Sequence, residues 1–249
     1  LRLRVCTRVS IATQSVRFVL PRIFASLSIF TVLSLIICMW LGLGLDLNKS
    51  LASWKMLQNE KTQKGPVTKT VDSAQWKVLN SRIEKNREAF RSQRQSGSVH
   101  ILLGIGSSLF VVLVCSIAVT YFIGTGRWCR EVVEAYGLAP EILRENQLLK
   151  RKSFPWALGG ILTALGVSAL GAAADPGTGM ASTADWVIPH LFAALVGICL
   201  ISYCLYALWG YIVRNNEVIN RVMREVHARR QGRGLERDHK SSSGAMHAG

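Results

Sequence analysis

Long apolar segments alternate with charged segments along this chain, and four of the apolar segments contain no Asp, Glu, Lys or Arg. These charge-free windows are residues 23–45, 95–126, 153–174 and 186–213. Each window has at least 22 residues, and a helix needs about 20 apolar residues to cross the hydrocarbon core of a bilayer. We therefore predict an all-α integral membrane protein with four transmembrane helices. The predicted spans are residues 23–45, 101–123, 155–174 and 187–211.

Aromatic and proline residues lie near the ends of these spans. Trp and Tyr favour the headgroup region, because the ring is apolar and the N–H or O–H group needs water. The residues so placed are Trp40, Tyr121, Trp128, Trp156, Trp186, Trp209 and Tyr211. Proline is tolerated where a helix starts, since the first N–H groups have no partner there. Pro21, Pro155 and Pro189 are expected at such starts.

The segment between the first two spans, residues 46–100, is predicted to form an outer loop in two parts. Residues 46–70 are polar, with a turn at Gly65-Pro66. Residues 71–94 have apolar side chains at helical spacing and charges elsewhere, which predicts an amphipathic helix. Ser96-Gly97-Ser98 should break this helix before the second span. The apolar stripe could lie on anionic headgroups or pack on the outer ends of the bundle.

On the other side of the predicted bundle the helices are expected to continue beyond the membrane. Residues 124–154 predict a helical hairpin, in which Gly137 ends one helix and Pro140 begins the next. In residues 212–249, valines at i, i+4 spacing predict a helical extension of the fourth span, followed beyond Arg230 by a disordered tail. We expect these extensions to form a small cytoplasmic bundle.

The distribution of Lys and Arg predicts the orientation of the spans. Residues 1–22 carry five basic residues, 124–154 carry six and 214–249 carry eight, whereas the short outer loop 175–186 carries none. Both termini are therefore predicted in the cytoplasm of a bacterial inner membrane, with an organelle inner membrane as the alternative. The loop 46–99 carries eleven basic residues and conflicts with this orientation, although the rule weakens for long loops.

The formal net charge of +15 indicates a partner of negative charge. Because the basic residues flank the apolar spans, anionic lipid is the expected partner, at about 1 kcal/mol per cation near the surface. Binding of nucleic acid is not expected, since no basic groove is indicated. The six cysteines lie in spans or predicted cytoplasmic segments, without a C-x-x-C pair, so no structural disulfide is expected.

Small residues recur at helical spacing in two of the spans. In the third span they are Gly160, Ala164, Ser168 and Ala172, and in the second span Gly104 and Ser108 belong to a similar stripe. Small residues let helices approach closely in lipid, where apolar burial offers little driving force. These stripes predict helix packing within the chain or, as an alternative, a homo-oligomer interface or contact with other membrane proteins.

The lack of charge in the spans argues against pumps, ion-coupled transporters and voltage sensors, which need intramembrane charges. No hydrolase, nucleotide or metalloprotease motif occurs, so we do not expect an enzyme. His100 and His190 lie near the outer ends of the second and fourth spans. Imidazole can ligate haem iron, so these residues could hold haem b or a quinone. The plainer interpretation is two histidines at the membrane interface.

These observations favour a structural or interaction protein of the membrane, such as an accessory subunit, scaffold or assembly factor. A small haem- or quinone-binding electron-transfer subunit using His100 and His190 is the first alternative. The second alternative is a sensor that reads the envelope through residues 46–99 and signals through the cytoplasmic bundle.

Overall fold

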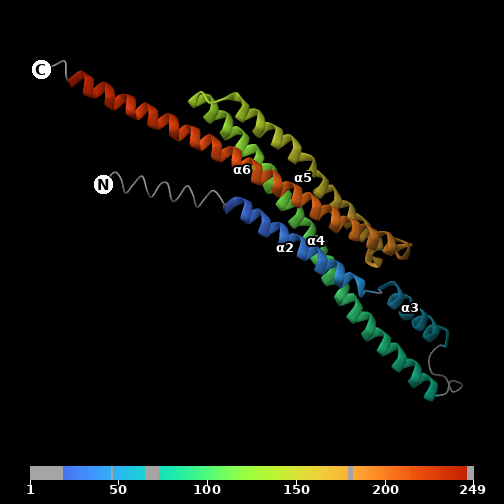
Figure 1. The fold of residues 1–249 in the computed structure, drawn as a ribbon. Helices are drawn as coiled ribbons and strands as arrows, with labels where there is room; N and C mark the ends of the chain where they lie inside the picture. The colour runs from blue at the N-terminus through green and yellow to red at the C-terminus, as the bar shows by residue number, and fades with distance from the viewer. Residues whose placement is uncertain (1–18, 46, 65–72, 179–181, 246–249) are drawn as a thin grey trace. The chain divides into compact units, whose positions relative to one another are not determined.

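The chain folds into long α-helices, which confirms the all-α prediction (Figure 1). The structure, a computed structural model, describes residues 19–45, 47–64, 73–178 and 182–245, and these contain no β-strand. Most of the basic N-terminal segment and the Gly65-Pro66 pair lie outside the described residues.

Five α-helices make up most of the described chain. They are α2 (Val19–Leu43), α3 (Leu47–Lys64), α4 (Ser73–Tyr136), α5 (Pro140–Ala174) and α6 (Val187–Ala245). Two short 3₁₀ helices, η1 (Pro176–Thr178) and η2 (Thr183–Trp186), lie between α5 and α6. Among the described residues, four helices contain a segment long and apolar enough to cross a membrane, namely α2, α4, α5 and α6.

The helices divide into two compact units, each built from separate parts of the chain. The first unit contains residues 1–29, 112–161 and 202–249, and the second contains residues 30–111 and 162–201. Each of α2, α4, α5 and α6 contributes residues to both units.

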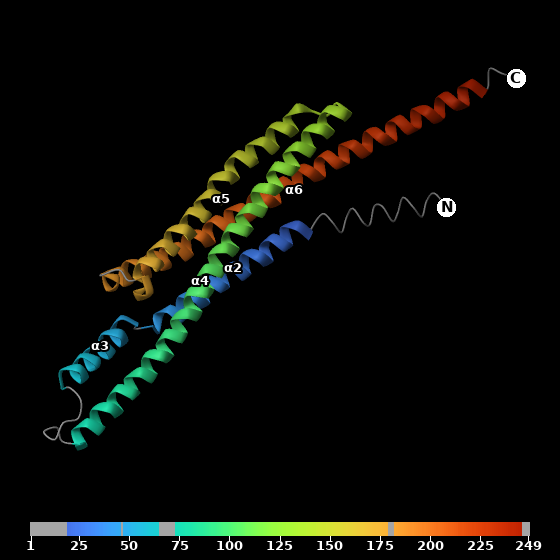
Figure 2. The ribbon, with the colours of Figure 1, turned by 180° about the vertical axis from the view of Figure 1, so that it is seen from behind.

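In the first unit, α4 and α5 form a hairpin beside α6, and Figures 1 and 2 show the three helices side by side. Gly137 adopts a left-handed backbone with φ of +58°, which a residue without a Cβ adopts at little cost. The Leu138 N–H donates to the Val133 carbonyl at 3.0 Å, as in a Schellman ending of a helix. The chain then reverses, and α5 begins at Pro140.

The core of the first unit continues along the predicted extension of α6. Val218, Val222 and Val226 are buried at 0%, 0% and 5% exposure. Side chains of α4, α5 and the turn between them are buried in the same unit, namely Cys129, Val133, Leu138, Ile142 and Leu149. The valine stripe therefore packs in a bundle of three helices, as its i, i+4 spacing indicates.

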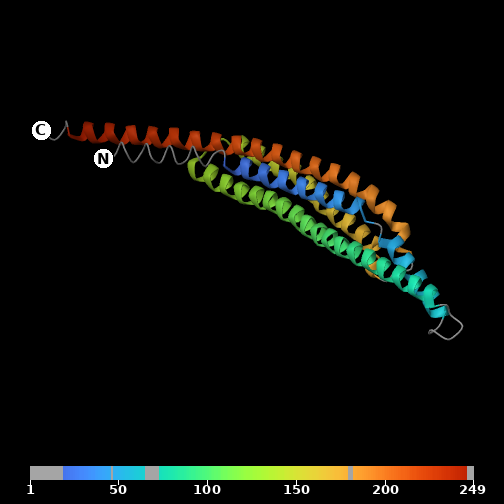
Figure 3. The ribbon, with the colours of Figure 1, turned by 90° about the horizontal axis from the view of Figure 1, so that it is seen from below.

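In the second unit, residues 47–64 form α3, where a polar loop is predicted. Figure 3 shows α3 beside the N-terminal part of α4. The rings of Trp54 and Phe90 stack with centroids 5.9 Å apart, and the ammonium of Lys61 lies 6.0 Å from the ring of Trp76. In the apolar stripe of the predicted amphipathic helix, Leu79 and Ile83 are buried, and Trp76 and Phe90 are half-buried. A helix that is polar by composition is thus held through tertiary contacts, in which its one aromatic residue, Trp54, and its Lys61 meet aromatic rings of α4.

The predicted helix break at Ser96-Gly97-Ser98 is wrong, because α4 runs through these residues to Tyr136. A helical glycine costs only about 1 kcal/mol relative to alanine, and the Ser98 hydroxyl donates to the Arg94 carbonyl at 3.0 Å. Gly97 is itself buried, and buried side chains before and after it, such as Ile83 and Ser107, hold the helix across this weak point.

The predicted position of Pro155 at a helix start is wrong, because Pro155 lies inside α5. Its neighbours Ser153 and Ala157 are buried, and this packing holds the helix together across one missing N–H donor.

The predicted disorder beyond Arg230 is also wrong, because the chain is helical as far as Ala245. Arg, Glu and Lys have good helix propensity, and here they extend a helix that is already nucleated.

Large apolar side chains face outward on the four apolar helices. Leu102 and Ile188 are each 70% exposed, and Phe192 is 68% exposed. Others exposed in the same way are Ile29, Phe30, Leu33, Ile37, Leu109, Leu113, Leu162 and Leu165. Exposed apolar surface of this extent calls for a lipid or protein cover.

Candidate functional site

Serine pairs join the helices of the second unit. Ser34 of α2 and Ser107 of α4 have their hydroxyl oxygens 2.5 Å apart, and Ser107 is 2% exposed. Ser108 of α4 and Ser168 of α5 have hydroxyl oxygens 2.7 Å apart. The structure therefore brings together two members of the predicted small-residue stripes, one from each helix.

The other stripe residues lie in different surroundings. A Cβ atom added to Gly160 would lie 3.2 Å from Sγ of Cys115 on α4 and 3.6 Å from Cβ of Cys204 on α6. Ala164 is 2% exposed, and the space beside Gly104 is taken by the Cys38 sulfur, 3.5 Å from an added Cβ. Ala172, by contrast, is exposed. The stripe of α5 is therefore a packing surface at its first three positions.

His100 of α4 packs against α2 in the second unit. Its Nδ1 lies 3.0 Å from the carbonyl oxygen of Cys38 and 3.6 Å from the Cys38 sulfur. A Cβ added to Gly42 would lie 2.7 Å from Cε1 of the imidazole. The ring thus occupies the space that glycine leaves on the neighbouring helix.

His190 of α6 makes the equivalent contact with α5. A Cβ added to Gly171 would lie 3.0 Å from its Cε1 and 3.5 Å from both ring nitrogens. The backbone of Val167 lies near the ring, yet Nδ1 is buried without a hydrogen-bond partner among the described residues. The imidazole is packed edge-on to a helix backbone.

The two histidines are close enough to interact electrostatically, so the structure places them in one region of the second unit. Each ring nevertheless rests against a glycine of a neighbouring helix, and the Cys38 sulfur fills the space beside Gly104. Within the described residues no group of three or more His, Cys, Asp or Glu could hold a metal ion. This geometry favours histidines that pack helices.

A buried amide network joins α4, α5 and α6 in the first unit. Asn146 and Asn215 are 1% and 0% exposed, and Nδ2 of Asn146 donates to Oδ1 of Asn215 at 2.6 Å. Nδ2 of Asn215 donates to the Tyr121 hydroxyl and to Oγ1 of Thr125, both at 3.1 Å. One asparagine on α6 therefore bonds to both other helices.

Gly126 of α4 makes room for this network. A Cβ added there would lie 3.3 Å from Oδ1 of Asn146, a buried oxygen that has no hydrogen-bond partner among the described residues. A backbone without a side chain lets the amide fit between the helices, as close approach at small residues generally does.

These asparagines are not among the site residues predicted from the sequence, although the sequence contains a signal for them. Asn146 lies between Ile142 and Leu149 at i+4 and i+7, and Asn215 stands between Ile212 and Val218 on the apolar stripe of α6. A single polar residue at a core position is typical of helices whose register is specified by a buried amide. The flanking charges concealed this pattern, because they placed both residues outside the apolar windows.

Charged contacts occur where these three helices meet near the turn between α4 and α5. Arg221 of α6 pairs with Glu145 of α5 at 2.9 Å, and Arg229 donates to the Tyr136 carbonyl at 2.5 Å. Arg230 donates to the Tyr136 hydroxyl and lies over its ring, 5.4 Å from the centroid. These groups are solvent-exposed, so each contributes well under about 1 kcal/mol, and the buried amides carry the specificity.

Comparison with known proteins adds no relative: no protein-family model, curated protein or solved structure matches this chain.

We predict that Asn215→Leu lowers the free energy of unfolding by about 1–3 kcal/mol, because Nδ2 of Asn146 is then buried without a partner. The double variant Asn146→Leu/Asn215→Leu should lose less than the sum of the two single changes, since no orphaned amide remains. Unfolding in detergent, followed by circular dichroism, measures both quantities. Strictly additive losses would show that the two amides do not act as a pair.

The packing of His190 predicts that Gly171→Ala destabilises the protein by about 1–3 kcal/mol, because the new methyl group meets the imidazole. The same substitution should be close to neutral in a His190→Ala background. Gly166→Ala is the matched control on α5, since nothing lies within 4 Å of an added Cβ there. The haem alternative instead predicts a Soret band in the purified protein that His100→Ala or His190→Ala abolishes.

Proposed function

We propose that this chain is an integral membrane protein of four spans with a structural or interaction role, as an accessory subunit, scaffold or assembly factor. The observation that carries the proposal is the outward apolar surface of α2, α4, α5 and α6, on which Leu102, Ile188 and Phe192 are about two-thirds exposed or more. The acyl chains of a bilayer can cover such a surface, so that the exposed apolar side chains do not contact water.

The use of polar side chains inside the helices supports the same role. Ser34, Ser107, Ser108 and Ser168 hydrogen-bond between helices rather than converging on a cavity. Hydroxyl groups used in this way hold a bundle together. Because these hydroxyl groups bond between helices, the outer surfaces of the helices are left apolar and can contact lipid or other membrane proteins.

The orientation belongs to the proposal as well. Both termini and the α4–α5 hairpin lie in the cytoplasm of a bacterial inner membrane, because the basic residues cluster in those segments. The hairpin and the extension of α6 then present a three-helix bundle at the cytoplasmic face, with Arg221, Arg229 and Arg230 on its surface.

We expect the protein purified in mild detergent from its own host to carry partner subunits, which native mass spectrometry detects by mass. Deletion of the gene should lower the amount of those partners in the membrane severalfold, since an unassembled subunit loses stability that binding supplies. A strictly solitary chain, with no change in other membrane proteins on deletion, would contradict the accessory role.

Membrane insertion is checked separately by extraction and labelling. The protein should stay in the membrane pellet at alkaline pH. In a cysteine-free background, an impermeant maleimide should label Lys61→Cys in intact cells and Glu134→Cys only after permeabilisation. Release from the pellet would contradict the proposal altogether, and the opposite labelling pattern would reverse the orientation alone.

The continuity of α4 favours a second candidate function, a sensor that reads the envelope through residues 46–99. The segment that packs on α3 and the segment that ends at Tyr136 belong to one unbroken helix. A continuous helix can transmit a rotation or a shift from one of its ends to the other.

This candidate predicts that replacing residues 47–64 by an unrelated helix changes hydrogen exchange in residues 124–154. The effect should disappear when Ser98→Pro interrupts α4, because proline breaks the hydrogen-bonded path. Unchanged exchange in the uninterrupted protein would rule out signalling through this helix.

A further inference from the structure

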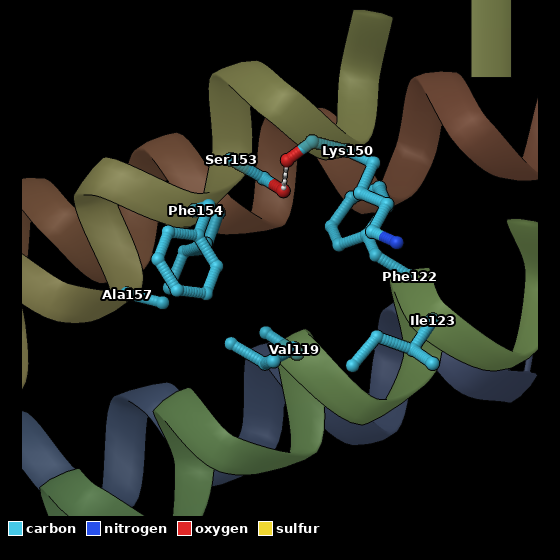
Figure 4. A pocket seen from close by; sticks show the side chains of 9 residues that line it. Val119, Phe122, Ile123, Lys150, Ser153, Phe154 and Ala157 are labelled. Carbon is cyan, nitrogen blue, oxygen red and sulfur yellow. Dashed lines mark hydrogen bonds between the residues drawn. The ribbon is translucent and has the colours of Figure 1, made fainter. Parts of the chain in front are cut away.

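A small apolar hollow opens between α4 and α5 in the first unit, with α6 at its back (Figure 4). Its volume is about 90 Å³, room for a short stretch of hydrocarbon rather than for a whole ligand. Val119 and Ile123 of α4 face Phe154 and Ala157 of α5 across the opening. Leu208 of α6 lines it as well. The hollow therefore suits a linear apolar chain.

Its polar boundary is a single cation. Lys150 lines one end of the hollow, is exposed, and forms no ion pair with an acidic residue among those the structure describes. The only other polar side chain of the lining, Ser153, already donates its hydroxyl proton to the Lys150 carbonyl at 2.9 Å. A ligand here meets hydrocarbon along its length and one positive charge at its end.

The position of the hollow relative to the predicted spans indicates the depth of the Lys150 ammonium in the membrane. Val119 and Ile123 belong to the last turns of the predicted second span, and Ala157 to the first turn of the third. Lys150 precedes the third span by five residues, about one and a half helical turns. In the proposed orientation, the hollow lies at the level of the inner-leaflet acyl chains, and the ammonium at the level of their phosphates.

The surrounding charge is also positive. Arg130 and Lys152 are exposed in the segment 124–154, which contains Lys150, whereas two acids of this segment, Glu131 and Glu145, are already paired with Arg127 and Arg221. Basic pockets between helices on the cytoplasmic side of a membrane bind acidic lipid headgroups. Charge complementarity thus selects an anionic lipid over a neutral one.

We propose that this hollow binds one anionic phospholipid of the cytoplasmic leaflet, with part of an acyl chain between α4 and α5 and its phosphate on Lys150. The inference rests on the proposed membrane insertion. It adds a specific lipid site to the general attraction between a basic protein and an acidic membrane.

Native mass spectrometry of the full chain in mild detergent, titrated with dioleoylphosphatidylglycerol or dioleoylphosphatidylcholine, tests the site. The unaltered protein should bind the first phosphatidylglycerol more tightly than phosphatidylcholine. Lys150→Ala should weaken that binding about fivefold, the value of one cation near a phosphate. Arg151→Ala is the matched control, because it removes a neighbouring exposed cation that does not line the hollow and should leave the first binding step unchanged.

The apolar part of the site is tested by Val119→Phe, which fills the hollow and should weaken binding of both lipids. Equal losses in Lys150→Ala and Arg151→Ala would overturn the proposal, as would unchanged phosphatidylglycerol binding in a folded Val119→Phe protein. These results can be told apart from failure of the proposed function. Release of the protein by alkaline extraction would contradict the proposed membrane insertion. If the protein stays in the membrane pellet and either overturning result is found, only the proposed lipid site is rejected.

Discussion

Close approach of helix backbones is the interaction on which the rest of this structure depends. In the bilayer that we propose, helices gain little by burying apolar side chains against one another, because lipid is equally apolar. Contacts must then come from small residues and from hydrogen bonds. Gly160 against Cys115 and Cys204, and the pairing of Ser108 with Ser168, are contacts of this kind.

The histidines follow from the same constraint. A helix that presents a glycine leaves a space at its surface, and in the second unit His100 and His190 fill such spaces beside Gly42 and Gly171. The positions of these histidines are therefore explained by the shape of the imidazole ring, which fills the space, rather than by its ability to bind a ligand. An imidazole packed against a backbone joins two helices as a larger apolar residue would, while it keeps one nitrogen available for a carbonyl such as that of Cys38.

Beyond the predicted membrane boundary the packing changes in character. There the first unit is a small three-helix bundle whose valine stripe can be buried away from water, and burial of apolar surface again contributes to stability. Such a bundle could slide by one turn with little loss, and the Asn146–Asn215 pair opposes this because a shift would orphan two buried amides. The hollow beside Lys150 lies next to this bundle in the same unit, where the helices are held in register.

A feature of this fold could be predicted from the sequence when it depends on residues close together in the chain, and could not when it depends on distant ones. The four apolar helices, the turn at Gly137 and the start at Pro140 follow from composition and local backbone preference, so they could be predicted from residues near one another in the chain. Three features could not be predicted in this way: the continuity of α4 through Ser96 to Ser98, the helix α3, and the helical course of α5 through Pro155. In each case packing by distant residues outweighed a local penalty of a few kcal/mol at most.

The candidate sites divide in the same way. The sequence identified the stripe of Gly160, Ala164 and Ser168 from its spacing, whereas only tertiary structure paired Asn146 with Asn215 and placed Lys150 at a hollow, since partners 69 residues apart have no local pattern that links them.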